Sequence, residues 1–162
     1  MTMRRTAQGE RRAPPWLKLL NRLTRPFLRR GIGPGPHHLL LVRGRRTGAM
    51  TATPIAVMDH RGARYIVSGY SGADWIKNYR HAGRAELRRG ARAEEVTLEV
   101  IPVGERAPIL RQFAKSVRGG RAFLTVAADA SDEAFLEASP RHPVFRIERA
   151  GPDQRPTPTA KP

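Results

Sequence analysis

Short stretches rich in apolar and β-branched residues, separated by glycine-containing turns, recur along the chain. These stretches cover residues 38–43, 50–58, 63–69, 85–89, 94–102, 123–127 and 144–149. The turns at 59–62 and 89–92 each contain a glycine, which can supply the positive φ that a tight hairpin needs. Hairpins in series predict an antiparallel sheet of about five to seven strands, arranged as a barrel or a sandwich.

Two segments between these stretches have helical spacing. Residues 74–82 place Trp75, Ile76 and Tyr79 on one face, with Asp74 as the predicted N-cap. Residues 107–118 form a second predicted helix, whose apolar face includes Phe113. Few helices and no alternation of strand and helix exclude a Rossmann arrangement.

The first 36 residues have a different pattern. Residues 15–23 predict an amphipathic helix, which Pro26 ends or kinks, and a short helical piece follows at 27–30. We therefore predict a disordered basic N-terminus at 1–13 and a helical segment with a Gly/Pro linker at 14–36. A barrel domain follows at 37–150, and a disordered proline-rich tail at 151–162.

Charge and composition narrow the function. The chain has 162 residues and a formal net charge of +16, so it attracts polyanions such as nucleic acid, anionic lipid or a multiply charged small molecule. Part of the arginine excess would also follow from a GC-rich genome. The absence of cysteine excludes thiolate catalysis, disulfides and iron–sulfur clusters. No stretch reaches the ~20 apolar residues of a membrane span, which favours a cytoplasmic location.

The familiar catalytic constellations are missing as well. The five histidines are scattered without acidic residues at helical ligand spacing, so no metal site is predicted. There is no Gly-x-Ser-x-Gly elbow and no P-loop, which leaves a hydrolase or kinase without the residues it needs.

A glycine-bracketed loop offers the best candidate chemistry. It reads Gly44-Arg45-Arg46-Thr47-Gly48 and lies at the tip of the first predicted hairpin. Backbone N–H groups, two guanidinium groups and a hydroxyl can converge there on a phosphate. A solvated turn has the same composition, so the loop alone leaves both interpretations open.

Three motifs in order resemble the deazaflavin-dependent nitroreductase family. The arginine loop is followed by Trp75 and Asn78 in a Trp-x-x-Asn motif, and the last predicted strand reads Pro143-Val144-Phe145-Arg146. The resemblance covers residues 39–149. It implies a mainly β fold, a split β-barrel like that of FMN-binding proteins, with an N-terminal helix and short peripheral helices.

The resemblance also implies an activity. Members of the family transfer hydride from reduced coenzyme F420 to a planar, electron-poor acceptor such as a quinone, a nitroaromatic or an enone. The deazaflavin of F420 carries a phosphate and an acidic polyglutamate tail, which a basic protein suits. Such a cofactor carries the reactive carbon itself, so no protein nucleophile is required.

The family's site residues map onto this chain by position. The arginine loop would contact the phosphate and the start of the tail, residues 53–54 would run beneath the deazaflavin, and backbone amides of 68–72 would face its ring. The implied cofactor-binding residues are Arg45, Arg46, Thr47, Gly48, Thr53, Pro54, Ser68, Gly69, Tyr70, Ser71, Gly72, Trp75 and Asn78.

Three of these residues have more specific expected roles. Tyr70 is the catalytic candidate: it would orient the substrate or donate a proton, or it would only cap the turn. Trp75 is expected to be a packing anchor, and Asn78 to fix the helix against the loop.

Two departures from the family pattern affect the expectation. Thr51 stands where relatives commonly have another arginine, which weakens the phosphate site. Residues 109–121 contain none of the tyrosines of nitroimidazole-reducing relatives, so the acceptor is left open.

Other interpretations remain at this stage. The barrel could bind FMN, haem or a lipid in place of F420, as related split barrels do. Trp16 to Arg30 could lie on an anionic membrane or pack on the barrel. A nucleic-acid binder is disfavoured, because few aromatic residues are present and no recognition motif occurs. A homodimer is a further expectation from the class of fold.

Overall fold

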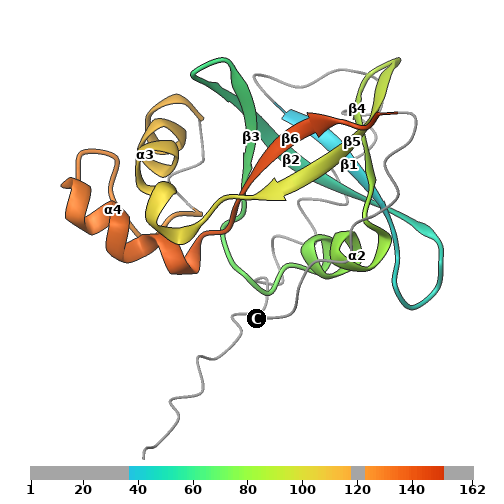
Figure 1. Ribbon diagram of the computed structural model, residues 1–162, viewed down its shortest axis with the longest axis horizontal. Helices are drawn as coiled ribbons and strands as arrows, with labels where there is room; N and C mark the ends of the chain where they lie inside the picture. Colours follow the sequence, from blue (N-terminus) through green and yellow to red (C-terminus); the bar gives the residue numbers. More distant parts are fainter. Residues whose placement is uncertain (1–36, 118–122, 152–162) are drawn as a thin grey trace, which may run out of the picture.

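Six antiparallel strands close into a barrel in the computed structural model, which describes residues 37–117 and 123–151 (Figure 1). The strands are β1 (His37–Arg43), β2 (Met50–His60), β3 (Ala63–Val67), β4 (Ala85–Arg89), β5 (Arg92–Val100) and β6 (Val144–Arg149). Their order around the barrel is β1-β2-β3-β6-β5-β4. The predicted antiparallel barrel is thereby confirmed.

Side chains fill the barrel because successive residues of a strand point to opposite faces. The interior takes alternate residues from all six strands. They are Leu40, Val42, Ile55, Val57, Ile66, Ala85, Leu87, Val96, Leu98, Phe145 and Ile147. Residues of the opposite parity, such as Met58 and Val144, belong to a second apolar cluster outside the barrel.

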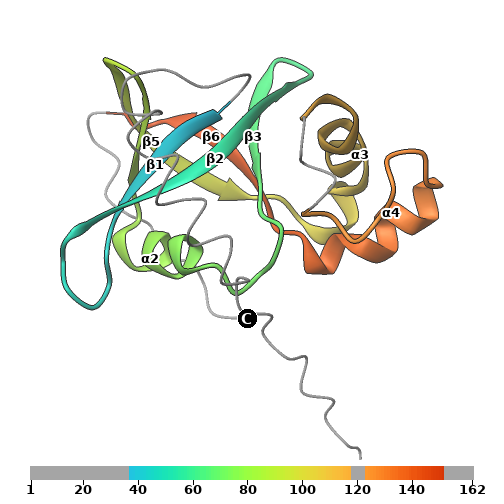
Figure 2. The same cartoon turned by 180° about the vertical axis from the view of Figure 1, so that it is seen from behind.

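Helix α2 (Asp74–Ala82) closes one end of the barrel (Figures 1 and 2). It adds Trp75, Ile76 and Tyr79 to the interior cluster, and the Tyr79 hydroxyl accepts a hydrogen bond of 2.6 Å from the Leu98 N–H. The bounds of the helix are as predicted, but the prediction of Asp74 as its N-cap is wrong. Ala73 occupies that position, and the Asp74 carboxylate turns away from the helix to pair with Arg45.

The second apolar cluster lies beneath α3 (Ala107–Ser116) and α4 (Asp132–Ala138), which cover one side of the barrel (Figures 1 and 2). Short 3-10 turns, η1 (Val103–Glu105) and η3 (Ser139–Arg141), flank the two helices. Phe135 of α4 is completely buried in this cluster. The helix predicted at 107–118 is confirmed as far as Ser116, whereas α4 was not predicted.

The strand predicted at 123–127 is wrong. That segment forms turns and bends, because it is tied to the end of η3 instead of to a neighbouring strand. The Thr125 N–H donates to Nε2 of His142 over 3.1 Å, and Leu124 enters the second cluster. Local β-propensity was therefore overridden by tertiary contacts.

Strand β2 pairs with β1 over one part of its length and with β3 over the other. Within the described residues β3 pairs with it from Val57 to His60, so residues 50–56 pair with β1 alone. Pro54 lies in the part of β2 that pairs with β1 alone, opposite Leu39. A proline lacks the N–H that a second neighbouring strand would require.

The predictions for the two ends of the chain fall outside the described residues. They are the basic N-terminus 1–13, the helical segment and linker 14–36, and the tail from 152 onward. Membrane contact through Trp16 to Arg30 lies there too and stays a prediction, as do the domain boundaries. None of the helices in the described part has the length and apolarity to cross a membrane.

His142 provides a test of the contact between 123–127 and the rest of the fold. The imidazole is fully buried, its Nε2 accepts from the Thr125 N–H, and the backbone of Ser68 and Gly69 lies near the ring. Burial lowers the pKa of His142 below its ordinary 6.5. Near pH 6.5 and below, His142 is therefore protonated in the unfolded chain but not in the folded chain. The free energy of unfolding consequently decreases as the pH drops below about 6.5.

We expect His142→Phe to lower the free energy of unfolding by about 1–3 kcal/mol at pH 8, because the Thr125 N–H loses its acceptor. Between pH 7 and pH 5 the free energy of unfolding should also decrease less in the variant than in the wild type. His37, whose pKa burial also lowers, contributes to the remaining decrease. Urea unfolding at several pH values measures both effects. An unchanged pH dependence in the variant would contradict this role.

Candidate functional site

The tip of the β1–β2 hairpin is held in shape by its own backbone. The Gly44 N–H donates to the Ala49 carbonyl over 2.8 Å, and the Gly48 N–H donates to the Gly44 carbonyl over 2.9 Å. Gly48 has a φ of 70°, and a Cβ on Gly44 would lie 3.1 Å from the Ala49 oxygen. Arg43 braces the turn through a 2.9 Å bond from Nη1 to the Gly48 carbonyl. Both glycines are thus required by the turn itself.

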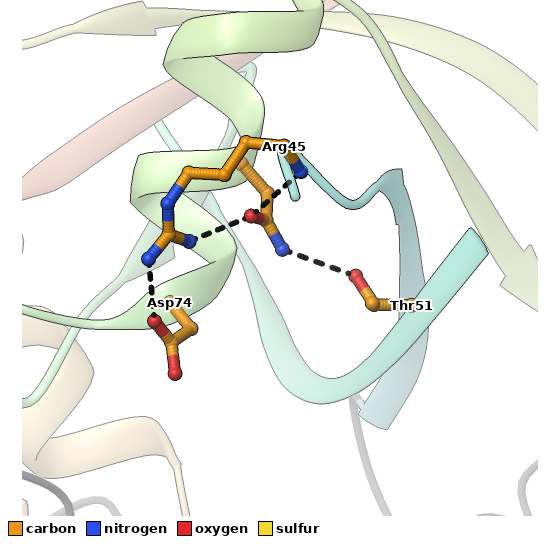
Figure 3. A network of polar contacts seen from close by, with 4 residues as sticks. Arg45, Thr51 and Asp74 are labelled. Atoms are coloured by element: carbon orange, nitrogen blue, oxygen red, sulfur yellow. Dashed lines mark hydrogen bonds and ion pairs between the residues drawn. The ribbon is translucent and has the colours of Figure 1, made fainter. Parts of the chain in front are cut away.

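Arg45 points from this tip back to α2 (Figure 3). Its N–H and its Nη1 both donate to Oδ1 of Asn78, at 3.3 and 2.7 Å, and its Nη2 lies 3.2 Å from Oδ1 of Asp74. Asn78 is buried, and its Nδ2 donates to Thr51 Oγ1 over 3.4 Å. The Thr51 hydroxyl in turn donates to the Val42 carbonyl. These bonds fasten the hairpin to α2.

Arg46 and Thr47 are exposed to solvent. Within the described part of the chain, neither backbone N–H has a hydrogen-bond partner, and neither does the Arg46 guanidinium. The Thr47 hydroxyl accepts from the Ala49 N–H and keeps its own proton to donate. Two N–H groups, a guanidinium and a hydroxyl are a donor set that fits a phosphate.

The loop at 68–72 joins β3 to α2 and lies at the same end of the barrel as the hairpin tip (Figures 1 and 2). The Ser68 N–H donates to the Pro143 carbonyl, and its hydroxyl donates to the Tyr70 carbonyl over 2.8 Å. A Cβ on Gly69 would lie 3.0 Å from the Cβ of Phe123. Close packing by Phe123 therefore favours glycine at this position.

Tyr70 is half-buried against the interior cluster. Burial, with a smaller contribution from the negative charge of Asp74, raises the pKa of its hydroxyl. The phenol therefore keeps its proton at neutral pH and can act as a hydrogen-bond donor. Asp74 is close enough to affect both Tyr70 and Arg45, although the sequence indicated only a capping role for it.

The remaining predicted residues are distributed differently. Trp75 is buried in the core, with its ring edge-to-face on Phe145 at 5.1 Å. Thr53 and Pro54 lie on β2 opposite Leu40 and Leu39. Ser71 and Gly72 occupy the loop beside Tyr70.

Hydrogen bonds and the ion pair thus bring together Arg45 and Asn78 with two residues that sequence reasoning missed, Asp74 and Thr51. The sequence feature that could have pointed to Thr51 is that it stands where an arginine was expected from the family resemblance. No group of three or more His, Asp or Glu side chains that could hold a metal ion occurs within 37–117 and 123–151.

Comparison with solved structures shows the fold. An FMN-binding protein related to pyridoxamine 5'-phosphate oxidase, from Nostoc punctiforme, is 10% identical with a TM-score of 0.50, over 86% of this chain and 83% of that one. A protein described as a domain-swapped dimer is 16% identical with a TM-score of 0.51, over 81% and 98%. A haem-binding protein from Mycobacterium smegmatis is 17% identical with a TM-score of 0.43, over 75% and 49%. The predicted split β-barrel is confirmed.

Comparison of the sequence defines the family. The search of curated proteins gave no match. The family model of the F420H2-dependent quinone reductases matches residues 28–128, more than half of the chain. The resemblance to F420-dependent reductases is thereby confirmed, and coenzyme F420 is the cofactor. The chain belongs to the F420H2-dependent quinone reductase family, a family of oxidoreductases.

Proposed function

We propose that this protein binds F420 with its hairpin tip against the cofactor phosphate and reduces a quinone. The observation that carries the proposal is the loop geometry. Arg45 is tied to α2 through Asn78 and Asp74, while Arg46 and Thr47 present donors that have no partner within the described residues. A rigid turn with exposed donors is preorganised for an anion, so less freedom is lost when the anion binds.

The other predicted residues complete the site in this proposal. The loop at 68–72 would face the deazaflavin ring, and Thr53 and Pro54 would lie beneath it. When bound, reduced F420 supplies a hydride, and the chain supplies binding, orientation and electrostatics. We propose residues 37–150 as the cofactor-binding domain.

Tyr70 has the properties of a proton donor. Reduction of a quinone to a hydroquinone requires one proton as well as the hydride, and a phenol with a raised pKa is protonated at neutral pH. Tyr70 lies in the loop next to the proposed ring site. We infer that its hydroxyl donates to the reduced oxygen of the acceptor.

The acceptor is proposed to be a quinone because of the family. Helix α3 has no tyrosine, and its apolar residues Ile109, Leu110 and Phe113 are buried in the second cluster. They are packed against the barrel and so are not available to line an acceptor site. Nitroaromatics and enones are the other acceptor classes to assay.

The loop assignment is tested with Arg46→Ala. Loss of a charge-assisted phosphate contact should weaken the binding of oxidised F420 by at least about 1.5 kcal/mol, or roughly tenfold. Titration followed by tryptophan quenching at moderate salt measures the change. Arg92→Ala is the matched control, because Arg92 is exposed at the start of β5 and carries the same charge.

Equal losses in the two variants would reveal diffuse electrostatics and remove the loop from the site. A parallel titration with FMN identifies the ligand. If the protein binds FMN but not F420, FMN takes the place of F420 in the proposal. If it binds neither, haem or a lipid becomes the favoured ligand of the barrel.

The role of Tyr70 is tested with Tyr70→Phe. If the hydroxyl donates a proton, kcat for quinone reduction should fall at least about tenfold, because general acid catalysis typically contributes 10²–10⁴. The dissociation constant of F420 should stay the same. Tyr65→Phe, in the second cluster beneath α3, is the control. An unchanged kcat would leave Tyr70 as a residue that only caps the turn.

A further inference from the structure

We propose that Asp74 competes with the anionic cofactor for Arg45, so that this carboxylate sets the affinity of the site. This inference rests on the proposed function. Asp74 would act on the cofactor through the side chain of Arg45. When the phosphate arrives, Arg45 exchanges the carboxylate of Asp74 for an oxygen of the ligand. The backbone of Arg45 stays in place during this exchange, because its N–H remains bonded to Asn78.

The contacts of Arg45 divide into a fixed set and an exchangeable one. Its N–H and Nη1 are bound to Asn78, which is 6% exposed and is itself held by Thr51. Its Nη2 is bound to Asp74, whose side chain is 82% exposed. Asp74 can therefore swing into solvent while Asn78 keeps the hairpin in place.

Electrostatics make the exchange favourable for a ligand with several charges. Asp74 is the only carboxylate that pairs with Arg45 within the described residues. An exposed pair of this kind contributes little to stability, because solvent screens it and both side chains lose freedom. A phosphate forms stronger charge-assisted bonds to a guanidinium. A carboxylate left beside the bound anion would repel it, so the loop selects against weakly charged ligands.

The charge of the same carboxylate also reaches the proposed proton donor. The charge of Asp74 is felt at the Tyr70 hydroxyl as well as at Arg45. Asp74 therefore interacts with both the phosphate loop and the proposed proton donor. Its movement on cofactor binding changes the field at both places.

The test is Asp74→Asn in the full chain, with binding of oxidised F420 as the readout. We expect the dissociation constant to fall about three- to tenfold at low ionic strength, with a smaller gain as salt screens the charges. Inorganic pyrophosphate, used as a competitor of F420, should also bind more tightly to the variant. Thermal unfolding checks that the variant is folded.

Asp132→Asn is a closely matched control. Asp132 is 80% exposed and pairs with Arg111, which is 31% exposed, much as Asp74 is 82% exposed and pairs with Arg45, which is 26% exposed. The change in net charge is the same. Asp132 lies on α4, away from α2 and the hairpin (Figure 1). We expect this variant to bind F420 like the wild type.

A double-mutant cycle localises the effect. In an Arg45→Gln background, Asp74→Asn should no longer tighten binding, because the cation for which the carboxylate competes is gone. Persistence of the full gain in that background would overturn the proposal.

The remaining outcomes are also decisive. Equal gains in Asp74→Asn and Asp132→Asn would mean that only net charge matters. Unchanged or weaker binding by Asp74→Asn would make Asp74 a residue that positions Arg45, which also overturns the competition. If the wild type does not bind F420, the proposed function fails and this inference fails with it. If the wild type binds and Arg46→Ala weakens binding, a failure at Asp74 leaves the proposed function intact.

Discussion

The site depends on the closure of one end of the barrel by α2. A barrel of six strands leaves its interior open at each end unless an apolar element covers it. Trp75, Ile76 and Tyr79 provide this cover, and the bond from the Leu98 N–H to the Tyr79 hydroxyl anchors α2 to β5. With that face buried, the helix must present Asp74 and Asn78 to the hairpin. Core packing and site geometry therefore share one element.

Asn78 connects the core to the cofactor loop. A buried amide needs partners for its polar atoms, and Asn78 finds them in Arg45 and Thr51 on the two sides of the hairpin. Thr51, which takes the place of a further arginine in the family pattern, thus contributes to rigidity instead of charge. The loop then has fewer arginines than the resemblance implies, but those present lie on a turn with a fixed shape.

Periodicity in the sequence was sufficient for the barrel and for α2. The strands alternate in and out, and residues 74–82 carry large apolar side chains at helical spacing, so local pattern and tertiary environment agree. The pattern failed at 123–127, where β-branched residues meet His142 in place of a neighbouring strand. It also failed at α4, a short helix anchored mainly by Phe135. The role of Asp74 was not predictable, because Arg45 lies far from it in the sequence.

The part of β2 that pairs with β1 alone has a consequence for association between molecules. Residues 50–56 pair only with β1 among the described residues, and a strand with an open side can accept a strand from another chain. Pro54 removes a donor in the middle of this segment and would interrupt any ladder built on it. The same proline that fits the proposed floor of the cofactor site therefore also protects a basic, arginine-rich protein against edge-to-edge aggregation.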